Sequence, residues 1–154
     1  MTSVLFVCLG NICRSPLAEA AFRLEAERIG LAVIVDSAGT GGWHVGEAPD
    51  PRAQAVARRN GAEIGAYRGR QVTPDDFYRF DLILALDLQN LKALRGMMPA
   101  DATAAVSLLL DEVAGRRGKA VADPYYGDDA GFDVTWADVT LAARHLARRL
   151  KEGA

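Results

Sequence analysis

The passage from an apolar run into a short polar loop near the N-terminus most constrains the fold. The run Val4–Val7 is apolar at every position, which is typical of a parallel strand covered by helices on both faces. Cys8 follows, and Gly10–Asn11 tolerates the left-handed backbone that a tight loop needs. Ser15 and Pro16 predict a helix N-cap and the first helical residue. The sequence therefore predicts a strand, a loop and a helix, with a thiol where the loop begins.

This loop has the residues needed to hold an oxyanion against sulfur. Successive backbone N–H groups in a tight loop bind anions, and a helix N-terminus adds positive potential. Helix N-termini and nearby arginine lower a cysteine pKa from roughly 8.5 to about 3.5–7.5, so we expect Cys8 to be largely thiolate. Arg14 presents a planar fork that matches two phosphate oxygens. The alternative is a buried strand cysteine followed by a helix-capping arginine. We favour a nucleophile and a phosphate clamp because strand, Gly-Asn and Ser-Pro signals accompany the pair.

Composition is that of one globular domain spanning residues 1–154, with 50% hydrophobic and 25% charged residues. The net charge of −2 disfavours nucleic acid or an anionic membrane as partner. No apolar stretch approaches the roughly 20 residues of a membrane helix. The two cysteines, Cys8 and Cys13, are too few for a disulfide scaffold, and a reactive thiol suits a reducing compartment. With no basic region before the first apolar run, we expect a cytoplasmic protein.

Predicted strands alternate with predicted helices. The strands are Ser3–Cys8, Ala32–Ser37, Phe80–Leu86 and Ala104–Leu110. The helices are Pro16–Gly30, Asp50–Asn60, Leu88–Met98 and Ala130–Lys151, with a further helix start at Thr73–Asp76. This order predicts a parallel α/β sheet with right-handed crossovers. Ligands of such sheets bind beyond the carboxyl ends of the strands, where Cys8, Ser37 and Asp87 are expected.

Displacing a phosphoryl group from an aryl or alkyl oxygen needs a proton for the leaving group. Asp123 is the candidate acid, because Pro124 stiffens the turn and favours an extended backbone before it. Alternatively, Asp-Pro only begins a solvated turn. Tyr125 and Tyr126 either anchor this loop or line a pocket for an aromatic substrate.

Four motifs resemble those of the low-molecular-weight protein tyrosine phosphatases, in family order and over essentially the whole chain. They are CLGNICRS at Cys8–Ser15, DSAG at Asp36–Gly39, FDLILALD at Phe80–Asp87 and DPYYG at Asp123–Gly127. The resemblance implies a three-layer sandwich, with a central four-stranded parallel sheet and helices on both faces. It also implies phosphotyrosine hydrolysis without a metal or cofactor.

By this resemblance, Cys8 attacks phosphorus to give a cysteinyl-phosphate while Asp123 protonates the leaving phenolate. Asp123 then activates water to hydrolyse the intermediate. The implied phosphate-binding residues form one run: Leu9, Gly10, Asn11, Ile12, Cys13, Arg14 and Ser15. The histidines, His44 and His145, lie far apart in the sequence and suggest no metal site.

The same matching implies a supporting group around the loop. Ser15 stabilises the thiolate, and Asn11, bonded to Ser37, keeps the loop in its strained shape. Asp87 either joins this group or caps the following helix. Tyr67 stands where many members have a histidine that helps to fix the loop asparagine, so the source of that contact stays open.

Residues that match the walls of the family's phenyl slot are Leu9, Ile12, Trp43, Tyr125 and Tyr126. Trp43 could instead belong to a satellite core, since an indole needs a core or a ligand to cover it. Arginine-phosphatase relatives carry threonine at the position of Ile12, so an apolar residue there favours phosphotyrosine. Cys13 matches a position that forms a disulfide with the nucleophile, which would halt oxidation of Cys8. Alternatively, Cys13 only fills space under the loop.

The expected partners are phosphotyrosine-containing proteins, with a tyrosine kinase as one candidate, and phosphate or another oxyanion in the site. Two other functions share part of this pattern. Arsenate reductases of similar fold share the loop, but they relay electrons through later cysteines, and none follows Cys13 here. A phosphopeptide-binding module would need neither an acid nor an intact nucleophile, and this chain has both.

Overall fold

The computed structural model describes residues 1–153 and contains a four-stranded, all-parallel sheet in the order β2-β1-β3-β4. Its strands are β1 (Thr2–Cys8), β2 (Val33–Gly39), β3 (Leu82–Ala85) and β4 (Ala105–Leu108). At the carboxyl edge Cys8 pairs with Gly39, and Val7 with Ala85. The predicted parallel sheet is thus confirmed, and the ends of β1, β2 and β3 meet along one edge.

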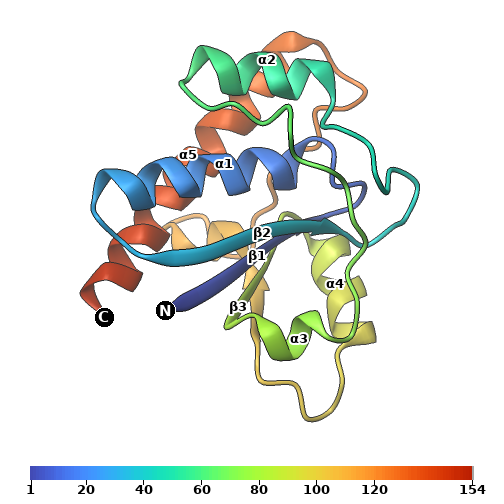
Figure 1. The fold of residues 1–154 in the computed structure, drawn as a ribbon, viewed down its shortest axis with the longest axis vertical. Coiled ribbons are helices and arrows are strands. Elements are labelled where there is room, and N and C mark those ends of the chain that lie inside the picture. The colour runs from blue at the N-terminus through green and yellow to red at the C-terminus, as the bar shows by residue number, and fades with distance from the viewer. Residues whose placement is uncertain (154) are drawn as a thin grey trace.

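Helices cover both faces of the sheet, which confirms the three-layer sandwich. They are α1 (Arg14–Arg28), α2 (Pro51–Arg59), α3 (Asp76–Arg79), α4 (Leu88–Met97) and α5 (Asp129–Glu152). Figure 1 shows α1, α2 and α5 on one face and α3 and α4 on the other. The predicted strand Ala104–Leu110 is too long, because the chain turns into the 3₁₀ helix η1 (Leu109–Glu112). Between residues 1 and 153 no helix is long and apolar enough to cross a bilayer.

Strand β1 is buried on both faces and divides its side chains between two cores. Leu5 and Val7 enter the core shared with α3 and α4, whereas Phe6 and Cys8 enter the core shared with α1 and α5. Side chains alternate along a strand, so this register aims the last residue, Cys8, at α1.

The predicted N-cap at Ser15 is wrong. Helix α1 begins at Arg14, and Cys13 occupies the N-cap position without a side-chain hydrogen bond to the helix. Pro16 is still tolerated there, because the first turn of a helix leaves its N–H groups without intrahelical partners. The hydroxyl of Ser15 is therefore available to the loop. By contrast, the predicted helix start at Asp50-Pro51 is confirmed, and the side chain of Asp50 caps α2.

Candidate active site

Cys8 lies at the base of the loop and is 3% exposed. Its Sγ is 3.0 Å from Ser15 Oγ, and the backbone N–H of Asn11 donates to it at 3.3 Å. Asn11 has a φ of 58°, the left-handed conformation that turns its N–H towards the sulfur. Gly10 does not adopt a positive φ. Two donors thus converge on the thiol, an arrangement that stabilises a sulfur anion.

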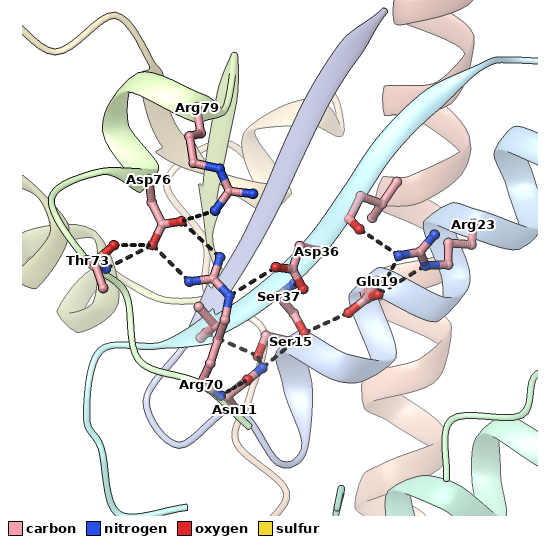
Figure 2. A network of polar contacts seen from close by, with 12 residues as sticks. Asn11, Ser15, Glu19, Arg23, Asp36, Ser37, Arg70, Thr73, Asp76 and Arg79 are labelled. Atoms are coloured by element: carbon pink, nitrogen blue, oxygen red, sulfur yellow. Dashed lines mark hydrogen bonds and ion pairs between the residues drawn. The ribbon is translucent and has the colours of Figure 1, made fainter. Parts of the chain in front are cut away.

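The side chain of Asn11 orders the hydrogen bonds around the loop (Figure 2). Its Nδ2 donates to Ser15 Oγ at 2.8 Å and to Ser37 Oγ at 3.0 Å. Its Oδ1 accepts from the backbone N–H of Arg70 at 3.0 Å. Because Ser15 Oγ accepts from Asn11, its own proton can be donated to Cys8.

Glu19 supports this network from the buried face of α1. Ser37 Oγ donates to Glu19 Oε1 at 2.8 Å, and Arg23 pairs with Glu19 Oε2 at 2.8 Å. Burial raises the pKa of Glu19, against the hydrogen bonds from Ser37 and Arg23. Glu19 is not among the residues predicted from the sequence; its spacing of four residues from Ser15, which places both on one face of a helix, is the signal that could have located it.

Tyr67 interacts with Arg23, and burial raises the pKa of its phenol. The contact to Asn11 Oδ1 therefore comes from the backbone of Arg70, three residues further along. Arg70 is fixed by Asp36 at 3.0 Å and by both carboxylate oxygens of Asp76 at 2.9 and 3.0 Å (Figure 2).

Arg14 is held in place by partners from two later segments. Its Nη1 donates to Asp87 Oδ2 at 2.7 Å and to the carbonyl of Val121 at 3.0 Å. Asp87 Oδ1 also accepts from the backbone N–H of Asn90 at 2.7 Å, so Asp87 caps α4 as well. Asp87 therefore supports the active-site loop and caps the following helix at the same time.

Asp123 lies near the other terminal nitrogen of Arg14, not the one that donates to Asp87. Its side chain is 42% exposed. Its Oδ2 is 3.6 Å from Arg14 Nη2, and its Oδ1 accepts from the backbone N–H of Tyr125 at 3.1 Å. The second contact makes a local turn around Pro124. The carboxyl group of Asp123 therefore lies beside Arg14 and is accessible to solvent.

The loop also presents backbone donors. Within residues 1–153, the N–H groups of Gly10, Ile12 and Cys13 have no protein acceptor. Since buried or constrained N–H groups normally find a partner, this nest is suited to the oxygens of an anion.

A cavity of about 290 Å³ opens above the sulfur. Its lining includes every residue predicted for the pocket and the three predicted catalytic side chains: Cys8, Leu9, Ile12, Arg14, Trp43, Asp123, Tyr125 and Tyr126. Trp43 is 72% exposed, so it forms a pocket wall and not a satellite core. His44, which was not predicted as a pocket residue, also lines the cavity and lies against Gly10.

Cys13 is buried, and both cysteines are free thiols. Burial raises the pKa of Cys13, and the nearby Asp50 and Cys8 raise it further. Cys13 is therefore a neutral thiol close to the nucleophile. Among the described residues, 1–153, no group of three or more His, Cys, Asp or Glu side chains is placed to hold a metal ion.

Sequence and structure comparisons with known proteins agree with one another. The family model for low molecular weight phosphotyrosine protein phosphatase matches residues 3–154. A low molecular weight phosphotyrosine protein phosphatase of Schizosaccharomyces pombe is 46% identical over 132 residues, covering 84% of each protein. A protein tyrosine phosphatase crystal structure from Entamoeba histolytica, with Hepes in its active site, has a TM-score of 0.93 and 35% identity and covers 99% of both chains.

Arginine phosphatases are also similar in structure. A cysteine-to-serine mutant of the arginine phosphatase YwlE, solved with a phosphorylated active-site serine, has a TM-score of 0.88 and 31% identity. The match covers 97% of this chain and 96% of the YwlE chain.

Proposed function

Because the chain belongs to the low molecular weight phosphotyrosine protein phosphatase family, we propose that it hydrolyses phosphotyrosine in proteins through a cysteinyl-phosphate intermediate. Small aryl phosphates are substrates of the same reaction. The observation that carries this proposal is the convergence of Cys8, Arg14 and Asp123 on one cavity.

In the first step, Cys8 Sγ attacks phosphorus as the bond to the phenolic oxygen breaks. Arg14 and the N–H groups of the loop that have no protein acceptor hold the three equatorial oxygens, over which the charge of the transferring group is spread in the transition state. Asp123 gives its proton to the leaving oxygen, so tyrosine departs as a neutral phenol.

In the second step, water attacks the phosphorus of the cysteinyl-phosphate and the S–P bond breaks. Asp123, now a carboxylate, takes the proton from water. Ser15 and the N–H of Asn11 stabilise the thiolate that leaves. The phosphorylated active-site serine of the similar YwlE mutant supports a phosphoenzyme of this kind.

The pocket walls favour an aromatic ring. Leu9, Ile12, Trp43 and Tyr125 provide apolar or aromatic surface around the opening. We expect phosphotyrosine-containing proteins as substrates, with a tyrosine kinase among the candidates. We also expect a reducing, cytoplasmic environment, which keeps the sulfur of Cys8 from being oxidised.

A comparison of purified variants tests the proposal. Wild-type protein should release phosphate from a phosphotyrosine peptide faster than from matched phosphoserine and phosphoarginine peptides. Cys8→Ser should abolish turnover, and Asp123→Asn should reduce it by at least about 100-fold. Asp133→Asn is the matched control, because Asp133 pairs with Arg59 on the surface. Full activity in Cys8→Ser, or a preference for phosphoarginine, would contradict the proposal.

A further inference from the structure

We infer that Arg52 is a positioning residue for the acid step, because it ties the loop that carries Asp123 to the loop that carries Cys8. This inference rests on the proposed function of the site. It concerns a side chain that lies in the first turn of α2 and belongs to neither loop.

The segment that carries Asp123 has no regular secondary structure between Val121 and α5. Arg52 binds two of its carbonyl groups: Nη2 donates to Tyr125 O at 2.9 Å, and Nη1 donates to Gly127 O at 3.2 Å. These carbonyls lie two and four residues after Asp123, and the N–H of Tyr125 bonds to the Asp123 carboxylate itself. Arg52 therefore holds the backbone turn that aims the acid.

Arg52 is itself held at three places. Its Nε and Nη2 donate to the two oxygens of Asp50 at 3.1 and 3.0 Å, and its guanidinium lies 4.6 Å from the ring centre of Phe132. Burial alone would raise the pKa of Asp50, but the hydrogen bonds from Arg52 outweigh it and lower that pKa. The pair therefore stays charged at neutral pH.

Asp50 completes the connection to the nucleophile loop. Its backbone N–H donates to the carbonyl of Ile12 at 2.9 Å. One continuous path thus runs from Ile12 through Asp50 and Arg52 to the carbonyls of Tyr125 and Gly127. We refer to this path as the Arg52 brace. It fixes the distance between the loop that binds phosphate and the carboxyl that protonates the leaving group.

Lysine cannot replace arginine in this role. The guanidinium uses Nε, Nη1 and Nη2 together, in a rigid planar fork, whereas an ammonium is a single point of charge. Arg52→Lys keeps the positive charge and loses the brace. Arg58→Lys is the matched control, because Arg58 lies on the same helix and, within residues 1–153, its guanidinium bonds only to the exposed Glu63.

The experiment compares two esters that differ in leaving group. Phenyl phosphate releases a phenol with a pKa of about 10 and depends on the acid, whereas p-nitrophenyl phosphate releases a far better leaving group. Arg52→Lys should lower kcat/KM about tenfold for phenyl phosphate and much less for p-nitrophenyl phosphate. Inhibition by inorganic phosphate should not change, because the phosphate loop is intact.

A double-mutant cycle shows whether Arg52 acts through Asp123. In an Asp123→Asn background, Arg52→Lys should have no further effect on phenyl phosphate. If Arg52→Lys does not fold, Asp50→Asn serves as a second variant, because it keeps a good N-cap residue. It should also lower kcat/KM for phenyl phosphate much more than for p-nitrophenyl phosphate.

Equal slowing of both esters, weaker phosphate inhibition, or an undiminished effect in the Asp123→Asn background would overturn the inference. Suppose that wild type hydrolyses both esters, that Cys8→Ser hydrolyses neither, and that Arg52→Lys has the same activity as Arg58→Lys. The proposed function then stands, and only the Arg52 brace is rejected. If wild type hydrolyses neither ester, the proposed function itself fails.

Discussion

Asp87 binds Arg14 with one carboxylate oxygen and caps helix α4 with the other. Its Oδ2 lies 2.7 Å from Arg14 Nη1, and its Oδ1 accepts from the N–H of Asn90 at 2.7 Å. The side chain of Arg14 is only 4% exposed, so the orientation of its guanidinium depends on this pair and on the carbonyl of Val121. The phosphate clamp is thus anchored to the start of a helix on the other face of the sheet (Figure 1).

Asp87→Asn should weaken phosphate binding while the helix cap is kept, since asparagine caps helices as well as aspartate does. The charge-assisted bond to Arg14 is lost, so we expect kcat/KM for an aryl phosphate to fall about tenfold and the inhibition constant of inorganic phosphate to rise. Steady-state kinetics measures both. Asp101→Asn, on an exposed residue bonded to Tyr78, is the control; an equal effect in both variants would contradict the prediction.

Ser15→Ala should slow turnover without changing the fold. The variant removes the hydroxyl 3.0 Å from Cys8 Sγ and leaves Asn11 Nδ2 with Ser37 as its acceptor. Loss of a hydrogen bond to a charged group predicts a decrease in kcat of about tenfold. The rate of Cys8 alkylation by iodoacetate at neutral pH should fall in parallel. Ser107→Ala in strand β4 should change neither rate.

Trp43→Ala should raise KM for a phosphotyrosine peptide and leave the stability of the protein unchanged. The indole lines the cavity but is 72% exposed, so its truncation opens no internal hole. The free energy of unfolding should change by less than about 0.5 kcal/mol. Steady-state kinetics with the peptide tests the change in KM, and urea unfolding tests the stability. Tyr78→Ala, an exposed aromatic on α3, should leave KM unaltered.

Asp76→Asn should destabilise the protein at pH 7 and should also impair the active-site loop. Asp76 is 0% exposed and binds Arg70, whose backbone N–H holds Asn11. Breaking a buried ion pair predicts a loss of about 3 kcal/mol in urea unfolding. Asp75→Asn, on the exposed neighbouring residue, is the control.

The effect of Asp76→Asn depends on pH in a defined direction. Burial alone would raise the pKa of Asp76, but the hydrogen bonds from Arg70 and Thr73 outweigh it, so the pKa in the folded state lies below its ordinary value. The unfolded state therefore binds a proton first as the pH falls, and the stabilisation is lost below about pH 4. The difference between wild type and variant should shrink when unfolding is measured in that acid range. A constant difference would argue against an ionic origin.

Cys13→Ser should make peroxide inactivation irreversible. We propose that, after peroxide converts Cys8 to a sulfenic acid, the Cys13 thiol attacks its sulfur, an S–S bond forms and water leaves. Dithiothreitol should then restore wild-type activity but not that of the variant, whose Cys8 proceeds to sulfinic acid. Mass spectrometry distinguishes the disulfide from the higher oxide. Equal recovery in both proteins would leave Cys13 as packing under the loop.

Features encoded by neighbouring residues were predictable from the sequence. The apolar run before Cys8, the Gly-Asn turn and the Asp50-Pro51 helix start each depend on conformational preferences within a few residues. The order of strands and helices gave the parallel sheet for the same reason. Ser15 shows the limit of this reasoning, because its preference for a cap was overridden by contacts with Cys8 and Asn11.

The sequence by itself determined which groups are available: a thiol, a guanidinium and a carboxyl, with the loop that separates the first two. Only the tertiary structure decided their partners, since Arg14 finds Asp87 73 residues away and Asn11 finds Arg70 59 residues away. The strand order β2-β1-β3-β4 brings these segments to one edge. Local propensities carry no information about such pairs, because their geometry follows from how whole elements pack.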